Sequence, residues 1–419
     1  MKQTEIGLIP DDWEVKRLGD VTRIQAGGTP STLFEAYWNG NIRWMNSGEL
    51  NLKRVYEVEG RITELGLNNS STHLIPKGCV LIGLAGQGKT RGTAAINYVD
   101  LCTNQSIAAI FPSDFHNSDF LYHVMDNKYQ ELRELSDGGG GRGGLNLKIL
   151  NDIQIPLPPL PEQQRIAKAL SDVDALISTT EKLLQKKRNI KQGTMQELLT
   201  GKKRLPGFAK SNNTKMTELG EIPEDWEVKK LGEFTRIQAG GTPSTLFEEY
   251  WNGNIRWMNS GELNMKRVYE VEGRITELGL ANSSTHLFPK NCVLIGLAGQ
   301  GKTRGTAAIN YVELCTNQSI AAIFPSFSHN SEFLYQNIDN RYNELRELSD
   351  GGGGRGGLNL KIIGNLEIAL PPKEEQNSIA KILSDMDNEI DLLNTKLEKY
   401  RNLKTAMMQQ LLTGKIRLV

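Results

Sequence analysis

The chain has 419 residues, of which 38% are hydrophobic and 23% are charged, so it is long enough to bury two or more hydrophobic cores. Its 49 basic and 49 acidic side chains give a formal net charge of zero, which argues against a protein that holds DNA on its own through a strongly basic surface. The apolar runs fall far short of the roughly 20 residues needed to span a bilayer, and residues 1–15 lack a signal-peptide pattern, so we expect a cytoplasmic protein.

The first part of the chain, residues 1–155, combines glycine-rich turns with short apolar runs such as CVLIGLAG and NQSIAAIFP. This texture predicts an α/β (α+β) globule that is rich in strands. The prolines of PLPPLPEQQ then end any strand and suit the start of a helix.

A long helix is predicted next, because residues 162–199 contain no proline. Apolar residues at alternating spacings of four and three form one stripe, which is clearest in the second half of the chain, for example at Ile379 and Leu383. At 1.5 Å per residue the helix would be about 57 Å long. Gly201 and Gly414 supply matching helix stops in the two halves.

The second half of the chain repeats the first at a constant offset. Trp13 in IPDDWEVKRLG returns as Trp226 in IPEDWEVKKLG, and the offset of 226 − 13 = 213 residues holds throughout without insertion or deletion. A period of this length indicates a duplicated domain with its connector rather than a solenoid. The predicted globules cover residues 1–155 and 217–368, the helical regions cover 156–204 and 369–419, and residues 205–216 link the two copies.

The short linker predicts how the copies are arranged. The second globule must begin at the far end of the first helix, and the second helix must run back antiparallel to bury its stripe. We therefore expect two globules separated by two long antiparallel helices in a coiled coil, with pseudo-two-fold symmetry. Val419 would then end near the first globule.

One motif resembles a phosphate-binding loop: Gly83–Thr90 satisfies GxxxxGK[ST], and Gly296–Thr303 repeats it. Such a loop must open a helix, whereas a β-like run that begins with Arg91 and a glycine follows here. The sequence therefore favours a glycine-rich hairpin turn that presents Gln87 and Lys89.

Candidate DNA contacts are side chains that can bond to base edges or phosphates. They come from the AGGTP segment, the hairpin turn, the aromatic and basic WNGNIRWMN segment, and the GGGGRGG stretch, for which a flexible linker without a partner is the alternative. In the first copy the candidates are Thr29, Arg43, Asn46, Gln87, Lys89, Thr90, Arg91 and Arg142. In the second copy they are Thr242, Arg256, Asn259, Gln300, Lys302, Thr303, Arg304 and Arg355.

No enzymatic constellation is recognisable, since the sequence lacks GxSxG and a histidine-rich metal cluster. The four cysteines form no CxxC pair, and we expect them to be reduced thiols in buried strands. The five histidines are expected at the surface or in turns. We therefore predict a non-catalytic chain without a metal or cofactor of its own.

At PLPPLPEQQRIAKAL the sequence resembles the specificity subunit of type I restriction-modification systems, and the resemblance covers essentially the whole chain. It includes the AGGTPST…YWNGNIRW opening, the NQS strand and the LxGxxRL ends of both helices. The resemblance implies two target-recognition domains, each reading one half of a bipartite DNA site, with the helices setting the spacer. It also implies that two modification (methyltransferase) subunits dock on the helical region, that restriction subunits join them, and that S-adenosylmethionine, ATP and Mg are bound by those partners.

The resemblance places partner docking at the start of each helix. The docking candidates are Pro158, Pro159, Glu162, Gln163, Pro371, Pro372, Glu375 and Gln376. The second signature departs from the first at four positions: Pro156, Leu160, Pro161 and Arg165 become Ala369, Lys373, Glu374 and Ser378. The two ends are therefore not expected to engage partners equally.

The near-identity of the two domains predicts a palindromic target, in which the same half-sequence is read on both strands. Two other functions fit parts of the sequence. One is a coiled-coil adaptor whose globules bind proteins without DNA readout, and the other is an ATPase that uses the phosphate-loop motif.

Overall fold

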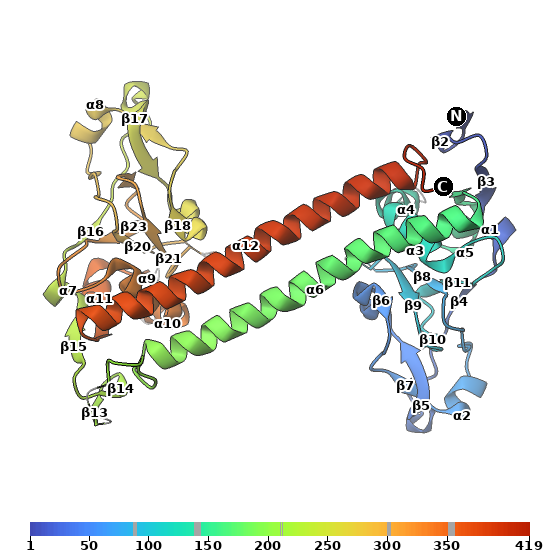
Figure 1. The fold of residues 1–419 in the computed structure, drawn as a ribbon, viewed down its shortest axis with the longest axis horizontal. Helices are drawn as coiled ribbons and strands as arrows, with labels where there is room; N and C mark the ends of the chain where they lie inside the picture. Colours follow the sequence, from blue (N-terminus) through green and yellow to red (C-terminus); the bar gives the residue numbers. More distant parts are fainter. Residues whose placement is uncertain (87–89, 138–143, 210, 212, 300–302, 351–356) are drawn as a thin grey trace. The chain divides into compact units, whose positions relative to one another are not determined.

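The computed structural model describes the chain except residues 87–89, 138–143, 210, 212, 300–302 and 351–356. Its residues group into two compact units: unit 1 is Met1–Lys182 with Thr395–Val419, and unit 2 is Leu183–Asn394. Each unit thus contains one globule and one half of each long helix, α6 (Leu160–Leu198) and α12 (Lys373–Leu411), which Figure 1 shows.

Short strands and helices build both globules in the same order. The first contains β1 (Lys2–Thr4), β2 (Gly7–Ile9), β3 (Glu14–Arg17), α1 (Leu18–Val21), β4 (Ile24–Ala26), η1 (Glu35–Tyr37), β5 (Trp38–Met45), η2 (Ser47–Leu52), β6 (Arg54–Val55), β7 (Arg61–Ile62), α2 (Glu64–Asn68), β8 (Val80–Gly83), β9 (Ala94–Asn97), β10 (Cys102–Thr103), β11 (Ile107–Ile110), α3 (Ser118–Asn127), α4 (Tyr129–Asp137), α5 (Leu147–Asp152) and β12 (Gln154–Leu157). The second contains β13 (Thr214–Thr217), β14 (Gly220–Pro223), β15 (Glu227–Lys230), α7 (Leu231–Phe234), β16 (Ile237–Ala239), η3 (Glu248–Tyr250), β17 (Trp251–Met258), η4 (Ser260–Met265), β18 (Arg267–Val268), β19 (Arg274–Ile275), α8 (Glu277–Ala281), β20 (Val293–Gly296), β21 (Ala307–Asn310), β22 (Cys315–Thr316), β23 (Ile320–Ile323), α9 (Ser331–Asn340), α10 (Tyr342–Asp350), α11 (Leu360–Gly364) and β24 (Glu367–Leu370).

A five-stranded sheet with the order β4-β11-β8-β9-β6 forms the centre of the first globule. Strands β8 and β9 are antiparallel, with Val80 opposite Ile96. Successive side chains of β8 point into different cores, since Val80 packs in one cluster with Phe120 of α3 and Leu81 packs in another with Met45. Burial on both faces explains why CVLIGLAG is a continuous apolar run rather than an alternating one.

A second sheet, with the order β10-β5-β7, packs beside the first. Strand β10 runs parallel to β5, with Cys102 opposite Trp44. All four cysteines are free and buried, which confirms the prediction of buried thiols. The second globule has the same sheets, with the orders β16-β23-β20-β21-β18 and β19-β17-β22.

The helix segments of unit 1 share the core of their globule. Ile166 and Leu170 of α6 and Leu411 of α12 belong to the cluster that contains Trp13 and Phe120. Part of the apolar stripe predicted from the sequence is therefore buried against the globule. In the described part of the chain, every helix is too short or too polar to span a lipid bilayer.

Ion pairs show that α6 and α12 run in opposite directions within each unit. In unit 1 Asp174 pairs with Lys404 and Glu181 with Arg401, so rising residue numbers in α6 meet falling numbers in α12. In unit 2 the pairs Lys187–Glu389 and Lys191–Asp387 follow the same rule. The predicted antiparallel pairing is confirmed inside both units.

The glycine stops of the two helices are also confirmed. Gly201 and Gly414 have φ angles of +71° and +67°, which favour glycine. A Cβ on Gly201 would lie 2.4 Å from Cδ of Pro223, and one on Gly414 would lie 2.4 Å from Cδ of Pro10. Glycine here both ends the helix and lets the following tail pass close to the start of a globule.

Three of the five histidines are buried. The expectation of a surface or turn position is wrong for His123, which lies inside a helix, whereas His116 and His329 lie at turns. His123 is 0% exposed, His116 is 5% exposed and His329 is 2% exposed. Burial lowers the pKa of each to about 4, so all three are neutral at pH 7. His123 lies in α3, where every residue from Phe120 to Met125 is buried.

Candidate nucleic-acid interface

One edge of the central sheet gathers loops from distant parts of the first globule. Because neighbouring strands run antiparallel, the carboxyl ends of β4 and β8 meet the amino ends of β9 and β11. Backbone hydrogen bonds join the loops, from Gly27 N to Ile107 O at 3.0 Å and from Leu84 N to Ser106 O at 2.8 Å. We name the described residues of these loops the loop edge: 27–31, 84–86, 90–93 and 104–106 in unit 1, and 240–244, 297–299, 303–306 and 317–319 in unit 2.

Two glycines of the AGGTP segment are required by close packing at the loop edge. A Cβ on Gly27 would lie 2.2 Å from the carbonyl oxygen of Thr103, and one on Gly28 would lie 2.5 Å from backbone atoms. This fit brings the hydroxyl of Thr29 within 2.5 Å of Oε1 of Gln105. Two polar side chains that can bond to a base are thereby held next to each other.

The phosphate-loop motif lies in a hairpin of the same edge. It connects β8 to the antiparallel strand β9, and Gly92 N donates to Gly83 O at 2.9 Å. A strand follows where a phosphate loop needs a helix N-terminus, which supports the hairpin interpretation. Thr90 and Arg91 lie on the loop edge, and their counterparts Thr303 and Arg304 lie at the same place in unit 2. Gln87, Lys89, Gln300 and Lys302 lie outside the described residues.

The glycine-rich stretch before α5 ends at this edge too. Leu145 N donates to Leu84 O at 3.0 Å, so the end of the stretch is anchored beside the hairpin. Leu358 N donates to Leu297 O at 2.9 Å in unit 2. The candidates Arg142 and Arg355 lie outside the described residues.

Arg43, a candidate on β5, is paired inside its globule. Its guanidinium donates to Glu57 through Nε at 2.8 Å and Nη2 at 3.0 Å. These bonds, with one from the backbone of Val58, lower the pKa of Glu57 to about 2. Arg256 and Glu270 form the same pair in unit 2. A phosphate could bind these arginines only in competition with a carboxylate, so their contact with DNA stays a prediction.

Asn46 has a local structural role as well as a place near the interface. Its Oδ1 accepts from Gly48 N at 2.8 Å and caps η2, as Asn259 does for η4 in unit 2. Asn46 borders the loop edge because Asn104 N donates to Met45 O at 3.0 Å.

The sequence did not identify the braces of the loop edge. The indole of Trp44 donates to Gly28 O at 3.0 Å, and that of Trp38 donates to Ser31 O at 3.2 Å. The two rings lie 5.1 Å apart in an edge-to-face arrangement. Both tryptophans thus fix the loop that carries Thr29 instead of lying deep in the core.

A second polar assembly, which we name the clasp, joins both ends of the chain to α6 in unit 1. Glu162 is 2% exposed and accepts from Trp13 Nε1 at 3.0 Å and from Arg417 at 2.7 and 2.8 Å. Arg417 also donates to Asp12 at 2.9 and 2.7 Å. The predicted return of the C-terminus to the first globule is therefore confirmed.

Unit 2 contains the same clasp with the copies exchanged. Arg204, which follows α6, donates to Glu375 at 2.7 and 2.8 Å and to Asp225 at 2.7 and 3.0 Å. Trp226 donates to Glu375 at 3.2 Å. Each clasp thus takes its arginine from one copy and its carboxylates from the other.

The clasp changes the interpretation of the PEQQ signature. Gln163 is 1% exposed and bonds to Asn117 N, Phe115 O and Pro158 O. Glu162, Gln163, Glu375 and Gln376 are buried and bonded within their units, so these side chains offer no surface to a partner. Pro158 and Pro371 are buried as well, and only Pro159 and Pro372 of the docking candidates are exposed. For those two prolines docking stays a prediction.

Comparison with known proteins places the whole chain in one group. Residues 10–189 and 223–400 match the family of the type I restriction modification DNA specificity domain. The type I restriction enzyme MjaIX specificity subunit of Methanocaldococcus jannaschii is 27% identical over 99% of this chain and 96% of its own length. The MjaVIII specificity subunit of the same organism is 25% identical over 98% of this chain and 94% of its own length.

Solved structures share the fold. The crystal structure of a type I restriction-modification S subunit from M. genitalium aligns with a TM-score of 0.64 at 15% identity and covers 98% of both chains. Across the described ranges, no group of three or more His, Cys, Asp or Glu side chains could hold a metal ion.

Proposed function

The chain belongs to the family of the type I restriction modification DNA specificity domain, and we propose that it is the DNA-specificity subunit of a type I restriction-modification complex. Two matched domains fit a bipartite target, with one half-site read by each domain. In each unit the loop edge is the surface proposed to read bases.

The observation that carries this proposal is the repetition of the loop edge in both units. The Thr29–Gln105 contact recurs as Thr242–Gln318 at the same distance of 2.5 Å. The brace from Trp44 to Gly28 recurs as Trp257 to Gly241, again at 3.0 Å. Two surfaces with the same side chains in the same places would read the same half-sequence. Because the copies are exchanged between the units, we infer an inverted-repeat, palindromic target.

Catalysis is proposed to reside in partner subunits. We infer that two methyltransferase subunits and restriction subunits assemble with this chain in the cytoplasm. S-adenosylmethionine, ATP and Mg would be bound by those partners. This chain would contribute recognition, with its helices setting the distance between the half-sites.

Adenine-methylation mapping by long-read sequencing tests the proposal, with the native host compared with a strain that lacks this chain. We expect one bipartite palindromic motif to lose methylation. An asymmetric bipartite motif would keep the specificity role and overturn equal reading by the two domains. If methylation is unchanged although the partner genes are expressed, the chain acts instead as a coiled-coil adaptor.

A further inference from the structure

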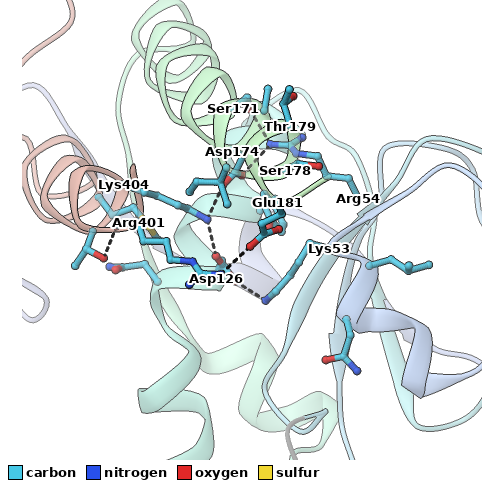
Figure 2. Close-up of a pocket in the computed structure, with 18 of the residues that line it drawn as sticks. Lys53, Arg54, Asp126, Ser171, Asp174, Ser178, Thr179, Glu181, Arg401 and Lys404 are labelled. Atoms are coloured by element: carbon cyan, nitrogen blue, oxygen red, sulfur yellow. Dashed lines mark hydrogen bonds and ion pairs between the residues drawn. The ribbon is translucent and has the colours of Figure 1, made fainter. Parts of the chain in front are cut away.

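A cluster of ion pairs lies where the first globule meets both long helices in unit 1 (Figure 2). Nζ of Lys404 on α12 is 3.2 Å from Oδ2 of Asp126 on α3 and 2.8 Å from Oδ1 of Asp174 on α6. One ammonium group therefore connects the globule and the two helices. We name these three residues the Lys404 joint.

The three side chains of the joint are shielded from water, with exposed fractions of 17% for Lys404, 15% for Asp126 and 16% for Asp174. Burial alone would lower the pKa of Lys404, but the two carboxylates outweigh burial and raise it. Lys404 is therefore charged at neutral pH.

Further cations complete the cluster around the same carboxylates. Lys53 lies 2.8 Å from Asp126, and Arg54 lies 3.3 Å from Asp174. Lys53 precedes strand β6 and Arg54 begins it. The Arg54–Asp174 pair runs from the globule to α6, whereas the Lys53–Asp126 pair lies within the globule. Figure 2 shows these side chains converging from the globule and from both helices.

The joint lies beside open space rather than within a packed core. A cavity of about 1110 Å³ adjoins it, lined by Tyr56 and Tyr122 of the globule, Ser178 of α6 and Thr405 of α12. Beside this cavity the ion pairs hold the globule on the helices together with the apolar contacts of Met408 of α12. Ion pairs give little net stability, but they have a strong geometric requirement, and breaking one leaves a shielded charge without its partner.

Among the described residues of unit 2, no ion pair joins Lys191 to Asp339, the counterparts of Lys404 and Asp126. Lys191, the counterpart of Lys404, pairs with Asp387 at 2.5 Å. Asp339, the counterpart of Asp126, pairs with Lys266 at 2.5 Å. Gln336 of α9 donates to Asp387 at 2.6 Å, and Arg267 of β18 lies 3.0 Å from the same carboxylate. The second globule is therefore connected to Asp387 by these two side chains, and not through a lysine that also bonds to Asp339. His123 occupies the Gln336 position in unit 1 and lies 3.3 Å from Ser171 instead.

We propose that Lys404 is a positioning residue for recognition, which locks the first domain on the helices through Asp126 and Asp174 and so makes the complex strict about spacer length. This inference rests on the proposed function. The second domain, in which Lys191 pairs with Asp387 but not with Asp339, contributes less to that strictness.

The test is methylation by the complete complex of three DNA targets, with the natural spacer, one base pair more and one base pair fewer. In Lys404→Met, we expect discrimination between the natural and altered spacers to fall about tenfold, equivalent to about 1.4 kcal/mol. Lys191→Met is the matched control, and its discrimination should stay within about twofold of wild type. Lys404→Arg should restore much of the discrimination, because the charge and the donors return.

Equal spacer profiles for Lys404→Met and wild type would overturn the proposal, provided that the natural target is methylated at a normal rate. Equal relaxation by Lys404→Met and Lys191→Met would overturn the assigned asymmetry. If the complex does not assemble with Lys404→Met, Asp126→Asn serves as the second variant. A wild-type dependence of methylation on spacer length in Asp126→Asn would also overturn the proposal. Failure of the proposed function would be distinguishable, because the wild-type complex would then methylate none of the three targets.

Discussion

Replacing Arg417 of the clasp should lower the stability of unit 1 by a measurable amount. In Arg417→Met, Glu162 keeps the Trp13 hydrogen bond but loses both bonds from the guanidinium. Loss of one partner from a fully buried pair costs roughly 3–5 kcal/mol. The Arg417 side chain is 27% exposed, and water partly screens its charge. We therefore expect the free energy of unfolding of unit 1 to fall by about 2–3 kcal/mol.

Hydrogen exchange measured by mass spectrometry can assign this loss to the correct unit. Peptides from the tail after α12 and from the start of α6 should exchange faster in Arg417→Met, whereas unit 2 peptides should not change. Arg204→Met is the internal comparison, and it should affect unit 2 at least as strongly because Arg204 is only 11% exposed. Adding Glu162→Gln to Arg417→Met should recover part of the loss, since no buried charge is then left unpaired.

An unchanged exchange rate in the unit 1 peptides of Arg417→Met would refute this reasoning. The clasp would then behave as a surface ion pair, which usually contributes about 0–1 kcal/mol to the free energy of unfolding. A loss that Glu162→Gln does not reduce would indicate that packing of the arginine, not its charge, stabilises the tail.

Three further predictions follow from the structure. Because burial lowers the pKa of His123 from 6.5 to about 4, the unfolded chain binds a proton that the folded chain does not, so stability falls as pH drops from 6.5 to 4. His123→Gln should make urea unfolding less dependent on pH in that window, and an identical dependence would contradict this role. A fragment of residues 1–212, which carries Arg204 and one complete stripe, should sediment as a homodimer, and a strict monomer would argue against the antiparallel pairing. Thr29→Val combined with Thr242→Val should lower methylation of the target at least about tenfold without changing complex assembly, whereas normal methylation would remove the loop edge from base reading.

Much of the fold could be predicted because its signals are local or periodic. The stripe that includes Ile379 and Leu383 predicted a long helix in the second copy. The glycines at positions 201 and 414 predicted where the two helices end. The β-like run after Thr90 was sufficient to favour a hairpin over a phosphate loop. Each of these signals depends only on residues that are close to one another in the sequence.

The clasp could not be derived in the same way, because Arg417 and Glu162 are 255 residues apart in the chain. A usable signal was present: the arginine of LxGxxRL and the glutamate of PEQQ both recur, and antiparallel helices place one beside the other. The histidine error has a different origin. His123 lies between residues that are apolar on nearly every helical face, and this context should have outweighed the usual preference of histidine for partly exposed positions.

The clasp has a consequence for the covalent topology of the chain. At the offset of 213, Val419 corresponds to Pro206 and Met1 to Thr214, which lie near the two ends of the linker between the copies. Arg417 joins the tail after α12 to Asp12 as Arg204 joins the linker to Asp225, so the clasp contacts do not depend on a covalent connection beside them. Circular permutation, with the old ends joined and a new break in the linker, is therefore compatible with this architecture.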